Sequence, residues 1–203
     1  MATEETARAA MRATPRHGWM TEPPSRAQLL FDDPYPSCAL EAGKFFPATQ
    51  GGLTDPVQPA DVAGDTPPPD GKIASAGYPH GGAPQLDEVR DWPKVELVSG
   101  ARQKVVWSFR QRHKTRRYNY FVTREDWDPA QPLSRAQFEP EPFARLEPNG
   151  DTPYWELPDP PAREPVEHKI TLPQRKGYHV ILGVWEVADT GAACYQVIDA
   201  HFS

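Results

Sequence analysis

The sequence contains no long apolar run and no excess of basic charge. None of its segments approaches the roughly 18 consecutive apolar residues of a membrane-spanning helix. Charged residues interrupt residues 1–20, where a secretion signal needs an apolar stretch. The net charge is −6, from 28 acidic and 22 basic residues, so no global positive field exists to hold nucleic acid or an anionic membrane. We therefore expect no membrane partner and no nucleic-acid partner.

Cysteine is also scarce. Cys38 and Cys194 are the only two cysteines and lie far apart in the chain, so one disulfide across a long loop is possible. Two cysteines cannot form a secreted framework held by several disulfides. We expect two thiols rather than a disulfide. For the chain as written, these features predict a cytoplasmic or particle-associated location. Secretion is the alternative if the chain is processed before His17.

Motifs for several common reactions are missing. The sequence has no G-x-S-x-G nucleophile turn, no G-x-G-x-x-G or other phosphate loop, and no Cys-x-x-Cys pair. Hydrolase, nucleotide-dependent and zinc-binding functions therefore have no supporting motif. The six histidines form no short metal-binding motif, so any metal site must be assembled from distant segments.

Proline and glycine, by contrast, are abundant, with 25 and 14 residues. They crowd residues 23–82, where no helical or strand period persists, and this predicts loops and short helices packed on another part of the fold. The proline-rich residues 140–165 are interpreted as a second irregular loop. We interpret residues 1–16 as an N-terminal arm and residues 17–203 as one folded domain.

Short strand-like segments begin near residue 95. Residues 104–109 and 118–123 are rich in β-branched and aromatic side chains and are interpreted as a strand pair joined by a basic linker. Residues 179–185 form a continuous apolar run, which is typical of a strand covered on both faces, and residues 195–202 supply a final strand. The pattern predicts an all-β protein, an antiparallel β-sandwich with a long loop and short-helix insertion.

Two groups of residues are candidates for function. His113 lies at the end of a candidate strand, where a loop can present a ligand, and His17 lies where the arm meets the domain. Phe45, Phe46 and Pro47 lie in a polar, glycine-rich loop with no strand period. These three residues either pack under the loop or form an exposed apolar platform, to which the flat face of a sugar ring is suited.

Ordered motifs along the chain resemble those of one enzyme family. They begin with His17-Gly18-Trp19-Met20-Thr21-Glu22-Pro23-Pro24-Ser25-Arg26-Ala27 and continue through residues 70–77, 112–113, 120–123, 127–135, 178–185, 188–190 and 195–199. From His17 onward the chain resembles the bacterial lytic polysaccharide monooxygenases of family 10, also called chitin-binding type-4 domains. The resemblance implies a fibronectin-III or immunoglobulin-like β-sandwich.

The resemblance also implies a copper site and a substrate. In the family one copper ion is held by a histidine brace. The brace consists of the α-amine and imidazole of an N-terminal histidine and the imidazole of a second histidine. Nitrogen ligands of this kind suit copper. By resemblance the brace maps onto His17 and His113. The flat face that binds chitin or cellulose maps onto Phe45, Phe46 and Pro47. Two further residues, Asp189 and Thr190, map near the copper.

Three positions beside the implied copper site depart from the family. Cys194 stands where the family has Phe or Tyr, Gln111 where it commonly has a small alanine, and Gln50, within about one residue, where it has a glutamate. A thiol can bind copper or be oxidised by it. The Gln111 side chain would crowd the open axial side, and loss of the glutamate removes a candidate proton donor. We assign these three residues to the catalytic region.

The N-terminus and the disulfides depart as well. Arg16 acylates the nitrogen of His17, and an amide nitrogen is not basic enough to coordinate as an amine does. Cys38 matches one family half-cystine. The other three positions fall near Leu30, Ala144 and His168. Loss of disulfides is tolerated in a reducing compartment.

Two classes of function remain open. In the first, the protein is a copper-dependent monooxygenase acting on chitin or cellulose, with His17 made N-terminal by processing. In the second, it is a catalytically impaired binding or structural module, attached to a larger protein assembly through residues 1–16.

Overall fold

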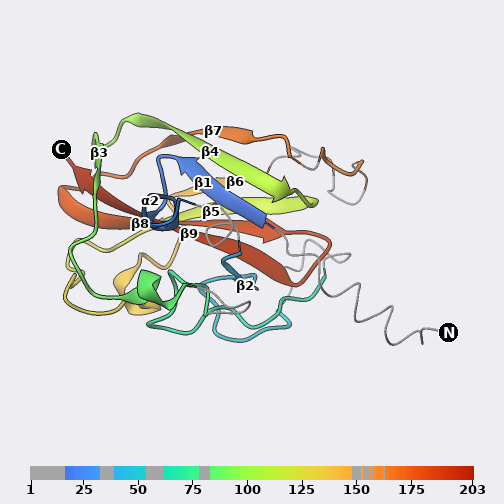
Figure 1. Ribbon diagram of the computed structural model, residues 1–203, viewed down its shortest axis with the longest axis horizontal. Helices are drawn as coiled ribbons and strands as arrows, with labels where there is room; N and C mark the ends of the chain where they lie inside the picture. The colour runs from blue at the N-terminus through green and yellow to red at the C-terminus, as the bar shows by residue number, and fades with distance from the viewer. Residues whose placement is uncertain are drawn as a thin grey trace.

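The computed structural model describes residues 17–32, 39–53, 62–77, 83–147, 152, 156, 158–161 and 163–203. Within these ranges two β-sheets face one another, and loops cover the outer side of the larger sheet (Figure 1). The smaller sheet has the order β1, β4, β7, with bounds His17–Glu22, Arg102–Gln111 and Val166–Thr171. Its neighbouring strands are antiparallel.

The larger sheet has the order β2, β9, β8, β5, β6, with bounds Glu41–Gly43, Ala192–Phe202, Gly177–Val187, Thr115–Val122 and Ala144–Leu146. Strand β3 (Val95–Leu97) runs parallel to β9, and the other pairs are antiparallel. The helical elements are α2 (Arg26–Leu30) and the 3-10 turns η1 (Pro84–Asp87) and η2 (Arg135–Gln137). No helix in the described ranges is long and apolar enough to cross a membrane. The expected β-sandwich with a loop and short-helix insertion is confirmed.

The main core lies between the two sheets. Buried and partly buried positions alternate along β4 from Val105 to Phe109, so Trp107 and Phe109 point inward while their neighbours point to the other face of the sheet. These rings meet inward side chains of the larger sheet. Phe109 packs edge-to-face on Trp185 at 4.8 Å between ring centroids, and Trp107 packs on Tyr118 at 5.6 Å. Aromatic pairs of this kind add to the free energy gained by burial.

A second core lies on the opposite face of the larger sheet. Val180, Leu182 and Val184 of β8 pack there against Ile73 of the long loop and Leu86 of η1, among others. Every residue of β8 from 179 to 187 is therefore buried, which confirms the expectation of a strand covered on both faces. The proline- and glycine-rich loops form this cover, visible below the larger sheet in Figure 1.

The expected strand pair is wrong. Residues 104–109 belong to β4 and residues 118–122 to β5, but β4 pairs with β1 and β7, whereas β5 pairs with β6 and β8. The chain crosses from one sheet to the other at residues 112–114. Both strands point aromatic side chains into the same core, where Trp107 Nε1 donates to Tyr120 Oη at 2.9 Å. The pattern identified two strands but not their partners.

A hydrogen bond lies where the resemblance placed a missing disulfide. Ala144 pairs with Tyr120 within the larger sheet, and Tyr120 Oη lies 2.7 Å from Nδ1 of His168 on β7 in the smaller sheet. Burial lowers the pKa of His168 to about 4, so the imidazole is neutral near pH 7. A buried polar contact thus joins the sheets at this point. Residues 1–16 and Cys38 lie outside the described ranges, as does most of residues 148–157.

Candidate metal and carbohydrate site

The two predicted metal ligands come from neighbouring segments at one end of the sandwich. His17 opens β1, and its backbone lies in register with Gln111 at the end of β4. His113 follows two residues later, in the connection to β5. The described part of His17 is its backbone, so its placement near His113 rests on strand register. Both strands reach this end because β1 and β4 are antiparallel.

His113 has one paired nitrogen and one orphaned nitrogen. Its Nδ1 lies 3.4 Å from Oδ2 of Asp189, and its side chain is 22 % exposed. Its Nε2 is buried and has no hydrogen-bond partner among the described residues. A buried nitrogen without a partner is unfavourable unless something binds it, and a neutral imidazole nitrogen is a good copper ligand. Nε2 of His113 is therefore suited to bind a metal ion.

His113 needs a further ligand to make a metal site. In the described ranges no group of three or more His, Cys, Asp and Glu side chains is arranged to hold an ion. The assignment of His17 as the second ligand therefore stays a prediction. Gln111, which we expected to crowd the axial side, is exposed at the end of β4, and Gln50 is exposed in the loop after Pro47. Their assigned catalytic roles stay predictions.

Cys194 lies beneath this end of the sandwich rather than on its surface. It is fully buried on β9, opposite Trp185 on one side and Glu41 on the other. Its Sγ lies 3.9 Å from Oε1 of Glu41, which is itself 6 % exposed. Solvent therefore does not reach the thiol directly, and its role toward copper stays a prediction.

The Phe45-Phe46-Pro47 segment divides between core and surface. Phe46 is 4 % exposed and packs edge-to-face on Phe121 at 5.2 Å. Phe46 thus packs under the loop, which was one of the two arrangements expected for this segment, and its role in substrate binding stays a prediction. Phe45 has φ of +73°, which breaks the alternation of an extended chain, and its half-buried ring lies about 5 Å from Lys44 Nζ and the Arg116 guanidinium. Pro47 is exposed.

This division makes a first prediction. Phe46→Ala is expected to lower the free energy of unfolding by about 3–5 kcal/mol, because it leaves a cavity among packed rings. Phe45→Ala should lower it by less than half as much, because that ring is only partly buried. Urea unfolding followed by circular dichroism measures both losses. Equal losses for the two variants would show that the rings share one environment.

The arginine that contacts the Phe45 ring belongs to a buried ion cluster. A β-bulge after Thr115 places Arg116 and Arg117 on the same side of β5. Both guanidinium groups donate to Oε2 of Glu186, at 2.9 and 2.7 Å, and all three side chains are less than a tenth exposed. These arginines lie in the basic linker expected from the sequence, and the cluster could not be predicted because the acidic partner is distant in sequence.

The turn that carries Asp189 and Thr190 is tied to the Phe45 loop. The backbone nitrogens of Lys44 and Asp65 both donate to the carbonyl oxygen of Gly191, at 3.1 and 2.8 Å. A Cβ at Gly191 would lie 2.7 Å from a loop carbonyl, so this close approach requires glycine. The turn and the loop therefore form one unit, which fixes Asp189 and Phe45 at the same end as His113.

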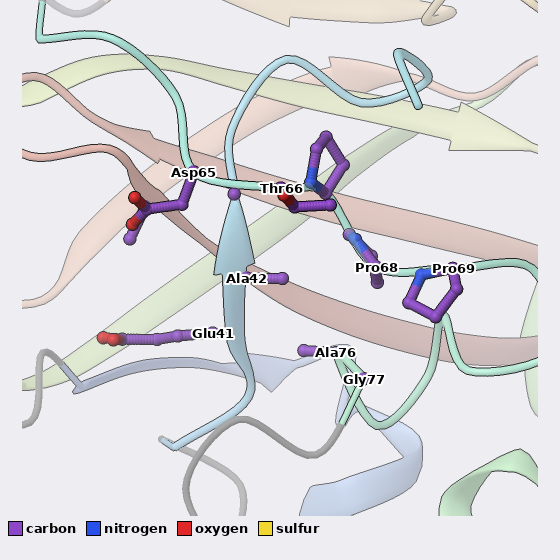
Figure 2. Close-up of a pocket in the computed structure, with 11 residues that line it drawn as sticks. Glu41, Ala42, Asp65, Thr66, Pro68, Pro69, Ala76 and Gly77 are labelled. Atoms are coloured by element: carbon purple, nitrogen blue, oxygen red, sulfur yellow. The ribbon is translucent and has the colours of Figure 1, made fainter. Parts of the chain in front are cut away.

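A cleft of about 300 Å³ adjoins this unit. Figure 2 shows Ala42 of β2 pointing toward the side on which Pro68, Pro69 and Ala76 lie, while the carboxylates of Glu41 and Asp65 lie on the other side of the strand. Residues 67–69 belong to the proline- and glycine-rich segment that was expected to form loops and short helices. No motif in the sequence marks this cleft.

Comparison with known proteins gives one family. A family model described as lytic polysaccharide mono-oxygenase, cellulose-degrading, matches residues 17–200. The GlcNAc-binding protein A of Photobacterium profundum is 40% identical over 146 residues, which make up 72% of this chain and 28% of that protein. The protein of the same name from Vibrio cholerae is 40% identical over 137 residues, 68% of this chain and 26% of that protein. The chain thus spans about a quarter of the length of these relatives.

Solved structures agree over nearly the whole chain. A chitin binding domain from Burkholderia pseudomallei is 45% identical with a TM-score of 0.83, and the match covers 93% of this chain and 100% of that one. An AA10 monooxygenase from Photorhabdus luminescens is 35% identical with a TM-score of 0.70, over 92% and 99%. A Bacillus amyloliquefaciens protein solved in complex with Cu(I) is 31% identical with a TM-score of 0.68, over 92% and 100%.

Proposed function

Because the chain belongs to the lytic polysaccharide mono-oxygenase family whose model matches residues 17–200, we propose that it binds chitin or cellulose and cleaves it oxidatively with one copper ion. The observation that carries this proposal is the buried, orphaned Nε2 of His113, next to the strand that begins at His17. An imidazole nitrogen in this state fits a copper ligand.

The chain's own residues supply the ligands. His113 would contribute Nε2, and His17 would contribute its imidazole and, where it is the first residue, its α-amine. The chemistry that copper supplies when bound is activation of an oxygen species toward a C–H bond of the sugar chain. Asp189, 45 % exposed beside His113, faces the same end and is available to the bound polysaccharide.

The substrate class follows from the relatives and the surface. The names of two relatives refer to binding of GlcNAc, and one solved neighbour is a chitin binding domain. In this chain Phe45 presents part of an aromatic ring at the copper end, supported by Arg116 and Lys44. C–H groups of a sugar ring pack favourably on such a face. We place the polysaccharide across Phe45, Pro47 and Asp189.

The proposal is tested by analysing reaction products. Protein that begins at His17 is loaded with copper and incubated with chitin or cellulose, a reductant and peroxide. We expect soluble oligosaccharides that contain one oxygen atom more than hydrolysis products, detected by mass spectrometry. His113→Ala should abolish these products. His201→Ala is the matched control, because His201 is exposed on β9 and pairs with the carboxylate of Glu96 at 3.0 Å.

A second function is favoured by one feature, the sixteen residues that precede His17 in the sequence. With the amine of His17 acylated, the same fold would serve as a polysaccharide-binding module attached through that arm to a protein assembly. Retention on chitin or cellulose without oxidised products, from protein that begins at His17 and has bound copper, would contradict the enzymatic proposal and support this one.

A further inference from the structure

The contact between His113 and Asp189 is built by the backbone. Thr115 at the start of β5 pairs with Val187 at the end of β8. One residue further on, Ala188 N donates to the carbonyl oxygen of Lys114 at 2.7 Å. The β4–β5 connection and the β8–β9 turn are therefore held side by side. The approach of Asp189 to His113 follows from strand register and not from a chance orientation of two surface side chains.

This contact bears on which nitrogen of His113 carries the proton. A neutral imidazole has one N–H donor and one lone pair, whereas an ionised carboxylate can only accept. Asp189 Oδ2 lies 3.4 Å from Nδ1, at the long end of the hydrogen-bond range. The pairing favours the tautomer with hydrogen on Nδ1, which leaves the lone pair on Nε2.

The surroundings of Nε2 are compatible with this tautomer. This nitrogen is buried and has no hydrogen-bond partner in the described part of the chain. A hydrogen on Nε2 would be a buried donor without an acceptor, which is unfavourable. A lone pair on Nε2 is the form that can bind a metal ion. The contact at Nδ1 thus favours this tautomer, and the buried Nε2 without a partner leaves its lone pair open to a metal ion.

We propose that Asp189 is a positioning residue, whose carboxylate holds His113 in the Nδ1–H tautomer so that Nε2 is ready to bind copper. The metal part of this inference rests on the proposed function, whereas the tautomer does not. Carboxylates that hold ligating histidines in this way typically contribute 10–100-fold to metal affinity. The carboxylate of Asp189 is 45 % exposed, so we expect about 10-fold, at the lower end of that range.

The test measures the tautomer in metal-free protein. Nitrogen chemical shifts of the His113 ring, recorded by NMR well above the ordinary histidine pKa of about 6.5, report which nitrogen carries hydrogen. We expect the Nδ1–H form in the wild type. Asp189→Ala should shift the ring toward the Nε2–H form that free histidine prefers. Asp189→Asn should retain the Nδ1–H form, because its amide oxygen still accepts. An Nε2–H ring in the wild type, or an unchanged ring in Asp189→Ala, would overturn the proposal.

The second readout is copper affinity, with a matched control carboxylate that contacts the same β4–β5 connection. Asp159 pairs with Lys114, the neighbour of His113, at 3.5 Å and is 90 % exposed. In protein that begins at His17, Asp189→Ala should weaken Cu(II) binding about 10-fold, and Asp159→Ala should not change it. Equal affinity in Asp189→Ala and wild type would overturn the metal part. A tautomer change in protein that binds no copper at all would support the positioning role and contradict the proposed function.

Discussion

Replacing Asp199 with alanine is expected to lower the free energy of unfolding by about 3–5 kcal/mol. Asp199 accepts from Nε of Arg26 at 2.8 Å and from its second terminal nitrogen at 2.6 Å, and both side chains are at most 5 % exposed. Without the carboxylate, a buried guanidinium loses its counter-charge. The Tyr178 hydroxyl, which donates to Asp199 at 2.8 Å, also loses its acceptor. Chemical denaturation measures the loss.

Two controls separate burial from charge in this prediction. Asp126→Ala removes the partner of Arg124 from a pair at 3.2 Å in which both side chains are about half exposed or more, and it should change stability little. Changing Arg26 to Met and Asp199 to Leu together should recover much of the loss, because no unpaired charge remains buried. A loss in Asp199→Ala no larger than in Asp126→Ala would show that this ion pair does not stabilise the fold.

The strands of the sandwich were predictable because their pattern depends on local chemistry. The apolar run of β8 requires cover on both faces, and the structure supplies it from the smaller sheet and the loops. The local sequence could not show whether β4 pairs with β5, because two strands that are consecutive in the chain can lie in one sheet or face each other across a core. In the structure Trp107 and Tyr120 meet across that core.

The candidate site was predictable only in part. The motif resemblance identified His17 and His113, and strand register brings their backbones to one end. The sequence of the Phe-Phe-Pro segment did not show which of the two rings is buried, because the positive φ at Phe45 determines which ring faces the core. The contact between His113 and Asp189 and the contact of the Phe45 ring with Arg116 both depend on partners more than 50 residues away.

The largest effect on copper is expected from the residues that precede His17. Protein that begins at His17 should bind Cu(II) at least about 100-fold more tightly than protein that retains residues 1–16, a difference of about 2.8 kcal/mol. The reason is chemical. In the longer chain the nitrogen of His17 is part of an amide, whose lone pair is delocalised, so one of three nitrogen ligands is lost. Isothermal titration calorimetry of both proteins with Cu(II) measures the difference.

This titration tests the copper proposal most directly when His113→Ala is made in both proteins. We predict tight binding by protein that begins at His17, weak binding by the longer protein, and loss of tight binding whenever His113 is replaced. Equal, tight binding by the two lengths would contradict the requirement for a primary amine at His17. Tight binding that survives His113→Ala would place the metal elsewhere in the chain.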